Sequence, residues 1–283
     1  MRARAPGSTS NLGPGFDVLG LALALHVEVE VTDAPRLSVR TEGEGEDLPQ
    51  DSSHLAARVA AEVRGHDRLE IAVRSSIPVG RGIGSSAALA LAAAAAAGSA
   101  DPLALAARYD GHGENAAASA FGGLVAAPMV GGTPVVRRLP LDPALRFVLL
   151  VPDRRLQTSA ARAVLPASVP FDDAVANLGR LALLLTGLAD ASLLERAAGE
   201  DRLHQAARAA LFPEAPELLS ALEEAGAAVA CWSGAGPSLL AICRAGSEAA
   251  KVREAGEVAM ERAGVPGRVL EVQPDLQGLV VEA

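Results

Sequence analysis

The chain has 283 residues, half of them hydrophobic, which is enough to bury a large core in one large domain or two ordinary ones. Its net charge of −9 and its aromatic content of only 2% argue against nucleic acid as a partner, because nucleic-acid binders need basic surfaces and stacking rings. No stretch reads as a signal peptide or a membrane span, so we expect a cytoplasmic protein without a membrane partner.

The chain opens with a polar, glycine-rich loop that leads into a strand, "APGSTSNLGPGFDVLGLALALHVEVEV". Val27, Val29 and Val31 alternate with polar residues, which is typical of a strand with one buried face. A later segment, "DSSHLAARVAAEVRG", has apolar residues at helical spacing and ends in glycine. It predicts an amphipathic helix with Ser52 or Ser53 as its N-cap.

A second glycine-rich loop, "IPVGRGIGSS", lies between a predicted strand, "RLEIAVRS", and an alanine-rich helix from Ala87 to Ala97. The helix is apolar on every face and too short to cross a bilayer, so it belongs in the core. We expect Ser85 and Ser86 at its N-cap. Free N–H groups and the helix dipole make such a helix start a binding site for an anion, most often a phosphate. The alternative is a tight turn that binds nothing.

The two best-known phosphate-binding motifs do not fit this loop. A P-loop requires a lysine next to its glycines, and the chain's only lysine is Lys251. "GRGIGSSAA" lacks the third glycine of the dinucleotide-binding fingerprint, and alanines occupy the region where its acidic residue belongs. The sequence therefore excludes a P-loop NTPase and disfavours a dinucleotide-binding fold.

After residue 100, predicted helices and strands mix without the regular alternation of a doubly wound sheet. Asp101 and Pro102 form a typical helix start, and strands resume at Phe147, so we expect a domain boundary near residue 145. In "AAVACWSGAGPSLLAICRAG", two strand-like runs flank a glycine turn and hold two cysteines, which we expect to be buried free thiols. The pattern predicts an α+β fold in two layers. Further helices are expected over residues 172–188, 193–211 and 216–225 and after Ser247, and a last strand ends at Val281.

Three segments, in this order, resemble the GHMP kinases, a family of small-molecule kinases: "PGSTSNLGPGFDVLGLAL", "PVGRGIGSSAALA" and "SGAGPS". The first segment is most similar to the homoserine kinase branch of that family. "GHGENAAASAFGG" resembles the GHPDN segment of the same branch, and "QTSAARAVLP" and "LHQAAR" also resemble stretches of it. The resemblance runs from about Ala5 to Ile242.

The resemblance implies a two-layer GHMP kinase fold with two halves. Residues 1–145 would form an N-terminal half like the second domain of ribosomal protein S5, and residues 146–283 a ferredoxin-like C-terminal half. ATP, Mg²⁺ and the acceptor would bind in the cleft between them. The implied reaction transfers the γ-phosphoryl group of ATP to the hydroxyl of L-homoserine, giving O-phospho-L-homoserine in threonine biosynthesis. A homodimer is also implied.

The same resemblance assigns the second glycine loop to the phosphates of ATP, which backbone N–H groups would bind. Magnesium would be held by Ser86 and Asp110, since Asp110 resembles the glutamate that precedes GH in the family, one carbon shorter. Glu114 stays open as the metal carboxylate, and Asp110 could instead be an ordinary helix-end acid. The residues assigned to ATP are Pro78, Gly80, Arg81, Gly82, Gly84, Ser85, Ser86 and Ala87.

Homoserine presents an ammonium, a carboxylate and a hydroxyl, so its site needs an acid, arginine donors and a neutral hydrogen-bonding group. Arg162 and Arg208 match the two family arginines that hold the carboxylate. Asp17 matches the aspartate that faces the amino group or the hydroxyl, and Asn115 and His112 would reach the hydroxyl. The acceptor residues are Asn11, Asp17, His112, Asn115, Arg162, Arg208 and Gly234, and the catalytic residues are Asp17, Asn115 and Ser86.

Several structural alternatives remain open at this point. Asn11 is also a typical turn former, and His112 could simply brace its loop. No residue stands out as a strong general base: Asp17 is the obvious acid, and a phosphate oxygen that takes the proton late is equally compatible. The alternative functions are a GHMP kinase for another small alcohol, isoprenoid or shikimate-like, and a non-catalytic ligand sensor. "GHGEN" departs from GHPDN at Gly113 and Glu114.

Overall fold

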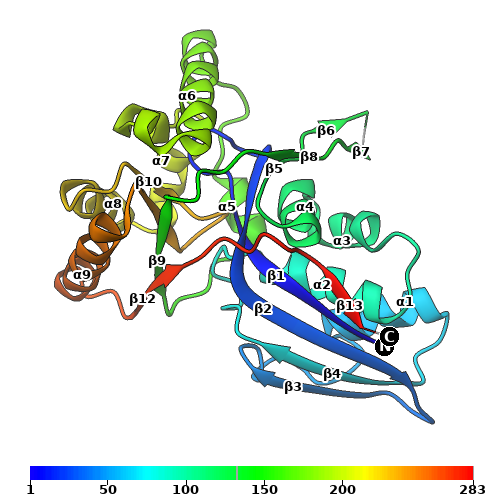
Figure 1. The fold of residues 1–283 in the computed structure, drawn as a ribbon. Coiled ribbons are helices and arrows are strands. Elements are labelled where there is room, and N and C mark those ends of the chain that lie inside the picture. The colour runs from blue at the N-terminus through cyan, green and yellow to red at the C-terminus, as the bar shows by residue number, and fades with distance from the viewer. Residues whose placement is uncertain (132, 283) are drawn as a thin grey trace.

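Two sheets with helices packed on them make up the fold in the computed structural model, which describes residues 1–131 and 133–282 (Figure 1). The first sheet has seven strands in the order β13-β1-β2-β4-β3, with β5 and β8 extending from β2. β3 and β4 pair in parallel, and the other neighbours are antiparallel. The strands are β1 (Arg2–Ser10), β2 (Leu19–Asp33), β3 (Ser38–Gly43), β4 (Leu69–Ser75), β5 (Leu124–Ala126), β8 (Arg137–Leu139) and β13 (Val280–Glu282).

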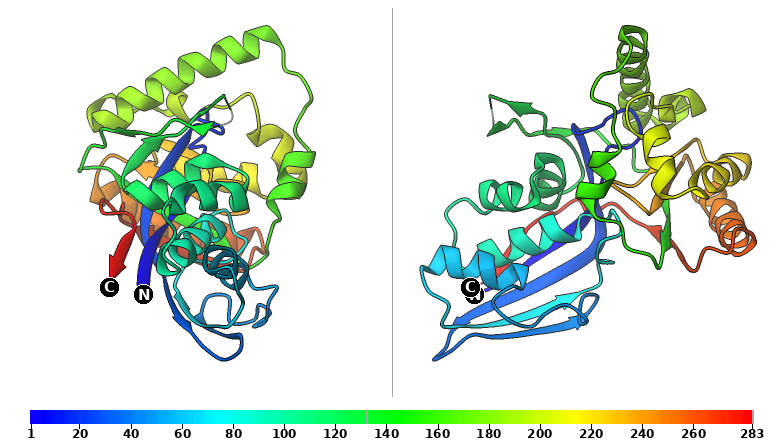
Figure 2. Two further views of the ribbon diagram at one scale, coloured as in Figure 1. Left: turned by 90° about the vertical axis from the view of Figure 1, so that its right-hand side faces the viewer. Right: turned by 180° about the vertical axis from the view of Figure 1, so that it is seen from behind.

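Helices α1 to α4 cover one face of this sheet, as the further views show (Figure 2). α2 lies at the centre and contacts the other three helices as well as β1 and β2. Its residues from Ala87 onward are buried, apart from the half-buried Leu89, so neighbouring backbones approach it closely. The predicted buried alanine helix is confirmed. The helices are α1 (Leu55–Arg64), α2 (Ser85–Ala96), α3 (Pro102–Asp110) and α4 (Gly113–Phe121).

The start of α2 differs from the expectation by one residue. Gly84 is the N-cap, with a left-handed φ of 59°, and it offers no side chain to cap the helix. A serine at this point would be strained by the left-handed backbone, which glycine adopts freely. Ser85 and Ser86 therefore belong to the first turn of the helix and are not its cap.

Two other local predictions were wrong. α1 is capped by the Nδ1 atom of His54 and not by Ser52 or Ser53. The helix expected over residues 193–211 is broken into short helical segments. Before α7, the Asp201 carboxylate accepts the backbone N–H groups of Leu203, His204 and Gln205, which competes with continuous helix formation there. The observed elements are η1 (Ala191–Leu193), η2 (Arg196–Gly199), α7 (Gln205–Arg208) and η3 (Ala209–Leu211).

The second sheet has four antiparallel strands in the order β10-β11-β9-β12. α8 and α9 contact its strands and share a buried apolar cluster with them. The predicted strands around the glycine turn are β10 and β11, and they carry Cys231 and Cys243 as buried free thiols. The elements are β9 (Arg146–Pro152), β10 (Val229–Trp232), β11 (Leu239–Cys243), β12 (Gly267–Val272), α8 (Ala215–Glu224) and α9 (Gly246–Arg262).

The two sheets share a continuous core. Phe147, Leu149 and Val151 of β9 belong to the same buried cluster as Leu21 of β2. The end of the chain returns to the first sheet. There β13 pairs with β1, which brings the two termini side by side (Figure 1). Segregated sheets, each with its own helices, confirm the α+β class. Since the last strand rejoins the first sheet, a division into residues 1–145 and 146–283 stays a prediction.

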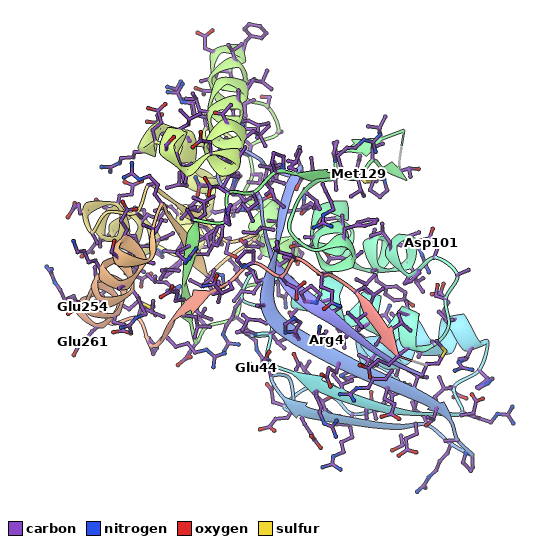
Figure 3. The ribbon with its side chains drawn as sticks, viewed as in Figure 1. Arg4, Glu44, Asp101, Met129, Glu254 and Glu261 are labelled. Atoms are coloured by element: carbon purple, nitrogen blue, oxygen red, sulfur yellow. The ribbon has the colours of Figure 1, made fainter. Side chains whose placement is uncertain are left out.

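Two parts of the chain project from this body. α6 (Phe171–Ala189) extends away from both sheets (Figure 1). The hairpin of β6 (Met129–Val130) and β7 (Thr133–Pro134) stands out beside α4, and the side chain of Met129 marks it in Figure 3. α5 (Thr158–Ala163) leads from β9 toward α6. Over the described residues, no helix has both the length and the apolar character needed to cross a bilayer.

Candidate active site

A cavity of about 690 Å³ opens between the two glycine-rich loops, the starts of α4 and α5, and α7. Pro78, Arg81 and Ala87 do not line it, and the Arg81 guanidinium donates hydrogen bonds to three backbone carbonyls, including that of Pro152. The cavity brings together the other residues predicted from the sequence: Asn11, Asp17, Gly80, Gly82, Gly84, Ser85, Ser86, Asp110, His112, Asn115, Arg162, Arg208 and Gly234, together with the alternative Glu114.

The second glycine loop is shaped by close backbone contacts that only glycine allows. Gly82 and Gly84 have φ angles of 74° and 59°, in the left-handed region. A Cβ atom on Gly82 would lie 2.2 Å from the carbonyl oxygen of Ser233, and one on Gly84 would lie 2.1 Å from Oγ of Ser8. The loop is therefore pressed against the rest of the fold, and the uncapped first turn of α2 lines the cavity. This arrangement suits an anion such as phosphate.

The N-terminal glycine-rich loop is held in an unusual conformation. Asn11, Leu12 and Asp17 all have positive φ angles, of 71°, 52° and 56°, which cost energy in residues other than glycine. The Asn11 side chain offsets this cost, because Nδ2 donates to the Gly234 carbonyl at 2.9 Å and Oδ1 accepts the Asp17 N–H at 3.0 Å. Asn11 thus fixes the backbone that presents Asp17.

Two arginines line the cavity, one on α5 and one on α7. Arg162 on α5 pairs with Asp17 at 2.6 Å. Arg208 on α7 is only 2% exposed and donates hydrogen bonds to the carbonyl of Gly234 at 2.8 Å and to Nδ1 of His204 at 3.1 Å. Burial, and next the charge of Arg162, lowers the pKa of Arg208 to about 10. Within the described part of the chain Arg208 has no ion-pair partner, so its charge is available to an anionic ligand.

Two carboxyl groups lie near the helix start in an environment that disfavours their charge. Burial raises the pKa of Asp110 to about 6, which Ser86 partly offsets, and raises that of Glu114 to about 7 with a further contribution from Asp17. Asn115 adjoins them, held by the hydroxyls of Ser8 and Ser10. A cation that bound between these carboxyl groups would favour their ionised forms.

His112 is the N-cap residue of α4, and its side chain makes no hydrogen bond to the first turn of the helix. Its Nδ1 lies 3.0 Å from the backbone oxygen of Asp110, so Nδ1 carries the proton and donates to that carbonyl. Burial lowers the pKa of His112, followed by the charge of Arg162, and this favours the neutral ring. Its Nε2 is then a hydrogen-bond acceptor.

Comparison with known proteins assigns this arrangement to a family. Residues 53–123 match the family model of the GHMP kinases N terminal domain, and residues 181–259 that of the GHMP kinases C terminal. The homoserine kinase of Moorella thermoacetica is 39% identical over 98% of both chains, and a homoserine kinase of Thermus thermophilus is 40% identical over 89% of this chain and 90% of the other. The chain belongs to the homoserine kinase family of GHMP kinases.

Solved structures support the same family fold. The homoserine kinase of Cytophaga hutchinsonii superposes with a TM-score of 0.85 at 28% identity, covering 100% of this chain and 97% of the other. Mevalonate kinase of L. major, solved with R-mevalonate, has a TM-score of 0.73 at 15% identity over 98% and 96%, which is a likeness of fold alone. The two-layer GHMP kinase fold predicted from the motifs is confirmed.

Sequence reasoning missed the apolar part of the cavity lining. Val27 of β2 and Val73 of β4 form part of its wall and also belong to the buried core, and their alternation with polar residues predicts only ordinary core. His54 also lines it and pairs with Thr41 at 3.3 Å. The sequence held no signal for this part, because the strand periodicity of a cavity wall is the same as that of a packed core. The apolar lining is completed by Leu48, Leu55, Val79, Ile83, Leu89 and Leu156.

We predict that Asp110 destabilises the ligand-free protein at high pH. Its folded pKa of about 6 exceeds the ordinary value of 3.8, so the folded state binds the proton more tightly, and stability falls as pH rises from about 4 through about 6. Asp110→Asn should raise the free energy of unfolding at pH 8 by up to about 3 kcal/mol, and by less than about 1 kcal/mol at pH 4. Urea unfolding in EDTA at both pH values measures this.

A matched control for Asp110→Asn is Glu254→Gln, on the exposed surface of α9 (Figure 3). It should leave the free energy of unfolding nearly unchanged at both pH values. Equal stabilisation by Asp110→Asn at pH 4 and pH 8 would contradict the assigned cause, because only an ionising group gives a difference.

Proposed function

We propose that this protein transfers the γ-phosphoryl group of ATP to the side-chain hydroxyl of L-homoserine, giving O-phospho-L-homoserine for threonine biosynthesis. The observation that carries the proposal is a buried arginine, Arg208, facing the same cavity as the uncapped helix start at Ser85. The arginines thus suit a small carboxylate, and the helix start suits a phosphate chain. Membership of the homoserine kinase family supports this choice of acceptor.

ATP would lie along the second glycine loop. The backbone N–H groups of Gly82, Gly84 and Ser85 would donate to its phosphates, and Ser86, which is exposed, adds a hydroxyl. The apolar part of the cavity lining, with Val27, Val73 and the other residues named above, would take the adenine ring. Pro78, Arg81 and Ala87 would act from behind the lining by shaping the loop.

Homoserine would bind between the two arginines and the start of α4. Arg208 and Arg162 would hold its carboxylate, and Asp17, freed in part from Arg162, would receive its ammonium. Asn115 and the Nε2 acceptor of His112 would orient the hydroxyl toward the phosphates. Since phosphoryl transfer depends mainly on positioning and charge, no strong base is required, and the proton can pass to Asp17 or to a phosphate oxygen.

Magnesium would be held by the hydroxyl of Ser86 and the carboxylate of Asp110, with Glu114 as the alternative carboxylate. The fit rests on hard oxygen donors: two carboxyl groups with raised pKa values line the cavity together with a serine hydroxyl. When bound, the ion would neutralise phosphate charge. The protein's own part is to aim these oxygens at the place where the phosphates would lie.

The acceptor is tested by an ADP-release assay with Mg-ATP. We expect turnover with L-homoserine and not with shikimate, mevalonate or galactose. Arg208→Ala should raise the KM for homoserine about 10- to 100-fold, the loss expected for a charge-assisted hydrogen bond, with little change in the KM for ATP. Arg196→Ala, at an exposed ion pair with Glu223, is the control.

Two other outcomes of this assay would favour the alternatives. Turnover with another alcohol but not with homoserine would keep the kinase and reject the acceptor. Binding of ATP or an amino acid without turnover of any alcohol would favour a non-catalytic ligand sensor. Arg162 and Arg208, which both line the cavity, favour an acceptor that has a carboxylate.

The metal carboxylate is tested by titrating Mg²⁺ at saturating ATP and homoserine. If Asp110 holds the ion, Asp110→Asn should raise the Mg²⁺ concentration for half-maximal activity by about tenfold or more, which corresponds to about 1.4 kcal/mol. Glu114→Gln, which alters a neighbouring carboxyl by the same chemical change, should shift it much less. The reverse order would assign the ion to Glu114.

We also propose that the protein is a homodimer that pairs through α6. Phe171, Val175 and Leu178 are 81%, 50% and 68% exposed, and their spacing places them on one helix face together with exposed Ala182. Apolar patches of this kind mark interaction sites. The stripe carries no charge and is compatible with its own copy across a two-fold axis, so a second copy is the occupant we assign.

A cytoplasmic location stays a prediction.

The dimer is tested by light scattering during size exclusion. The wild-type protein should have twice the chain mass of 28.7 kDa, and Leu178→Asp should have the chain mass, because a buried, unpaired carboxylate opposes association. Val258→Asp, at a 49% exposed position of α9, is the control and should remain dimeric. A monomeric wild type, or a Leu178→Asp variant that stays dimeric, would overturn this interface.

A further inference from the structure

The ring of Phe16 lies among the cationic and aromatic groups behind the cavity. Its centroid is 5.5 Å from the guanidinium carbon of Arg162 and 5.4 Å from that of Arg208. The imidazole of His204 stacks on it, with centroids 4.8 Å apart and planes inclined by 25°. Phe16 does not itself line the cavity. One side chain therefore contacts both predicted carboxylate-binding arginines without facing the ligand.

The electrostatics of this cluster favour an aromatic ring. Arg162 and Arg208 carry like charges, and the charge of Arg162 contributes to the lowered pKa of Arg208. Arg162 is paired with Asp17, whereas Arg208 hydrogen-bonds only to neutral acceptors in the described part of the chain. The face of a benzene ring is electronegative and attracts a nearby guanidinium by about 0.5–2 kcal/mol. Phe16 thus offsets part of the cost of holding two cations together.

His204 ties the ring to Arg208. Because arginine can only donate, Nδ1 of His204 must accept the hydrogen bond from Arg208. Nε2 then carries the proton and donates to the Gly13 carbonyl at 2.9 Å. Burial lowers the pKa of His204, which agrees with this neutral form. The imidazole plane is fixed by the two hydrogen bonds and by the stack on Phe16, so the ring helps to set the direction of the Arg208 donor.

We infer that Phe16 is a positioning residue for acceptor binding, which holds Arg162 and Arg208 at the spacing that one carboxylate requires. The inference rests on the proposed function, since it takes the carboxylate to be that of homoserine. A guanidinium fork binds two oxygens only in a narrow range of orientations. Without the ring, the arginines keep their charge but lose their common support. Carboxylate binding then weakens, while the helix start at Ser85 is unaffected.

The test measures steady-state kinetics of Phe16→Leu and Phe16→Met, which fill space without a ring, and of Phe16→Tyr, which keeps it. We expect the first two to raise the KM for homoserine about tenfold, with kcat and the KM for ATP within about twofold of wild type. Phe16→Tyr should stay nearer to wild type than either. Thermal unfolding of each variant separates this effect from loss of fold.

A matched control is Phe212→Leu. The ring of Phe212 also lies under a guanidinium, that of Arg154 at 4.4 Å, but it belongs to the core behind the second sheet. This variant should lose stability and keep the KM for homoserine. If it raised that KM as much as Phe16→Leu, the effect would be a general consequence of removing a ring, and the inference would be overturned.

Combining Phe16→Leu with Arg208→Ala distinguishes positioning from a purely structural role. If Phe16 acts through Arg208, the effect of Phe16→Leu on kcat/KM should largely disappear once Arg208 is absent. An undiminished effect in the double variant would overturn the inference, as would an unchanged KM in Phe16→Leu. Failure of the wild-type protein to phosphorylate homoserine would reject the proposed function and the inference together, whereas the first two outcomes reject the inference alone.

Discussion

The carbonyl oxygen of Gly234 connects the segments around the cavity through hydrogen bonds. It accepts hydrogen bonds from Nδ2 of Asn11 at 2.9 Å and from Nη1 of Arg208 at 2.8 Å. The hydroxyl of the adjacent Ser233 lies 2.8 Å from the Gly82 carbonyl oxygen. One turn of the second sheet thereby positions the N-terminal loop, the glycine loop and the buried arginine. Because these segments are far apart in the chain, the cavity takes its shape only when both sheets have packed together.

The charges that gather at the cavity are incompletely balanced by the protein itself. Arg208 is buried against neutral acceptors, and burial, which leaves the ionised forms of Asp110 and Glu114 poorly solvated, raises the pKa of both. Only Asp17 and Arg162 form a direct pair among the cavity residues that the structure describes. A ligand that carries both an ammonium and a carboxylate would exchange this single pair for two new ones. The unliganded protein thus bears an electrostatic cost that a ligand of suitable charge relieves.

Local features of the fold were predictable from the sequence, whereas the meeting of distant residues was not. The alanine helix and the glycine loop follow from propensity and from backbone geometry within a few residues. Arg162 and Asp17 are 145 residues apart, and only the family resemblance placed them in one site before the structure was known. The continuous helix predicted across Asp201 was wrong, and the Asp201 carboxylate accepts backbone N–H groups there that would otherwise be free for helix formation. Val27 was unrecognised as a cavity residue because alternation does not tell a cavity wall from a core.

The position of Glu114 shows why a departure from the family pattern leaves the fold intact. A Cβ atom on Gly20 of β2 would lie 2.4 Å from the carbonyl oxygen of Glu114, so α4 packs on the strand at a distance that only glycine permits. That contact fixes the backbone of the first turn, and Ser8 then holds the side chain of Asn115. The resemblance implies that glutamate stands here in place of aspartate. The longer side chain extends from a backbone that the glycine contact already determines. The substitution therefore changes how far the acid reaches into the cavity, and it does not change the packing of α4.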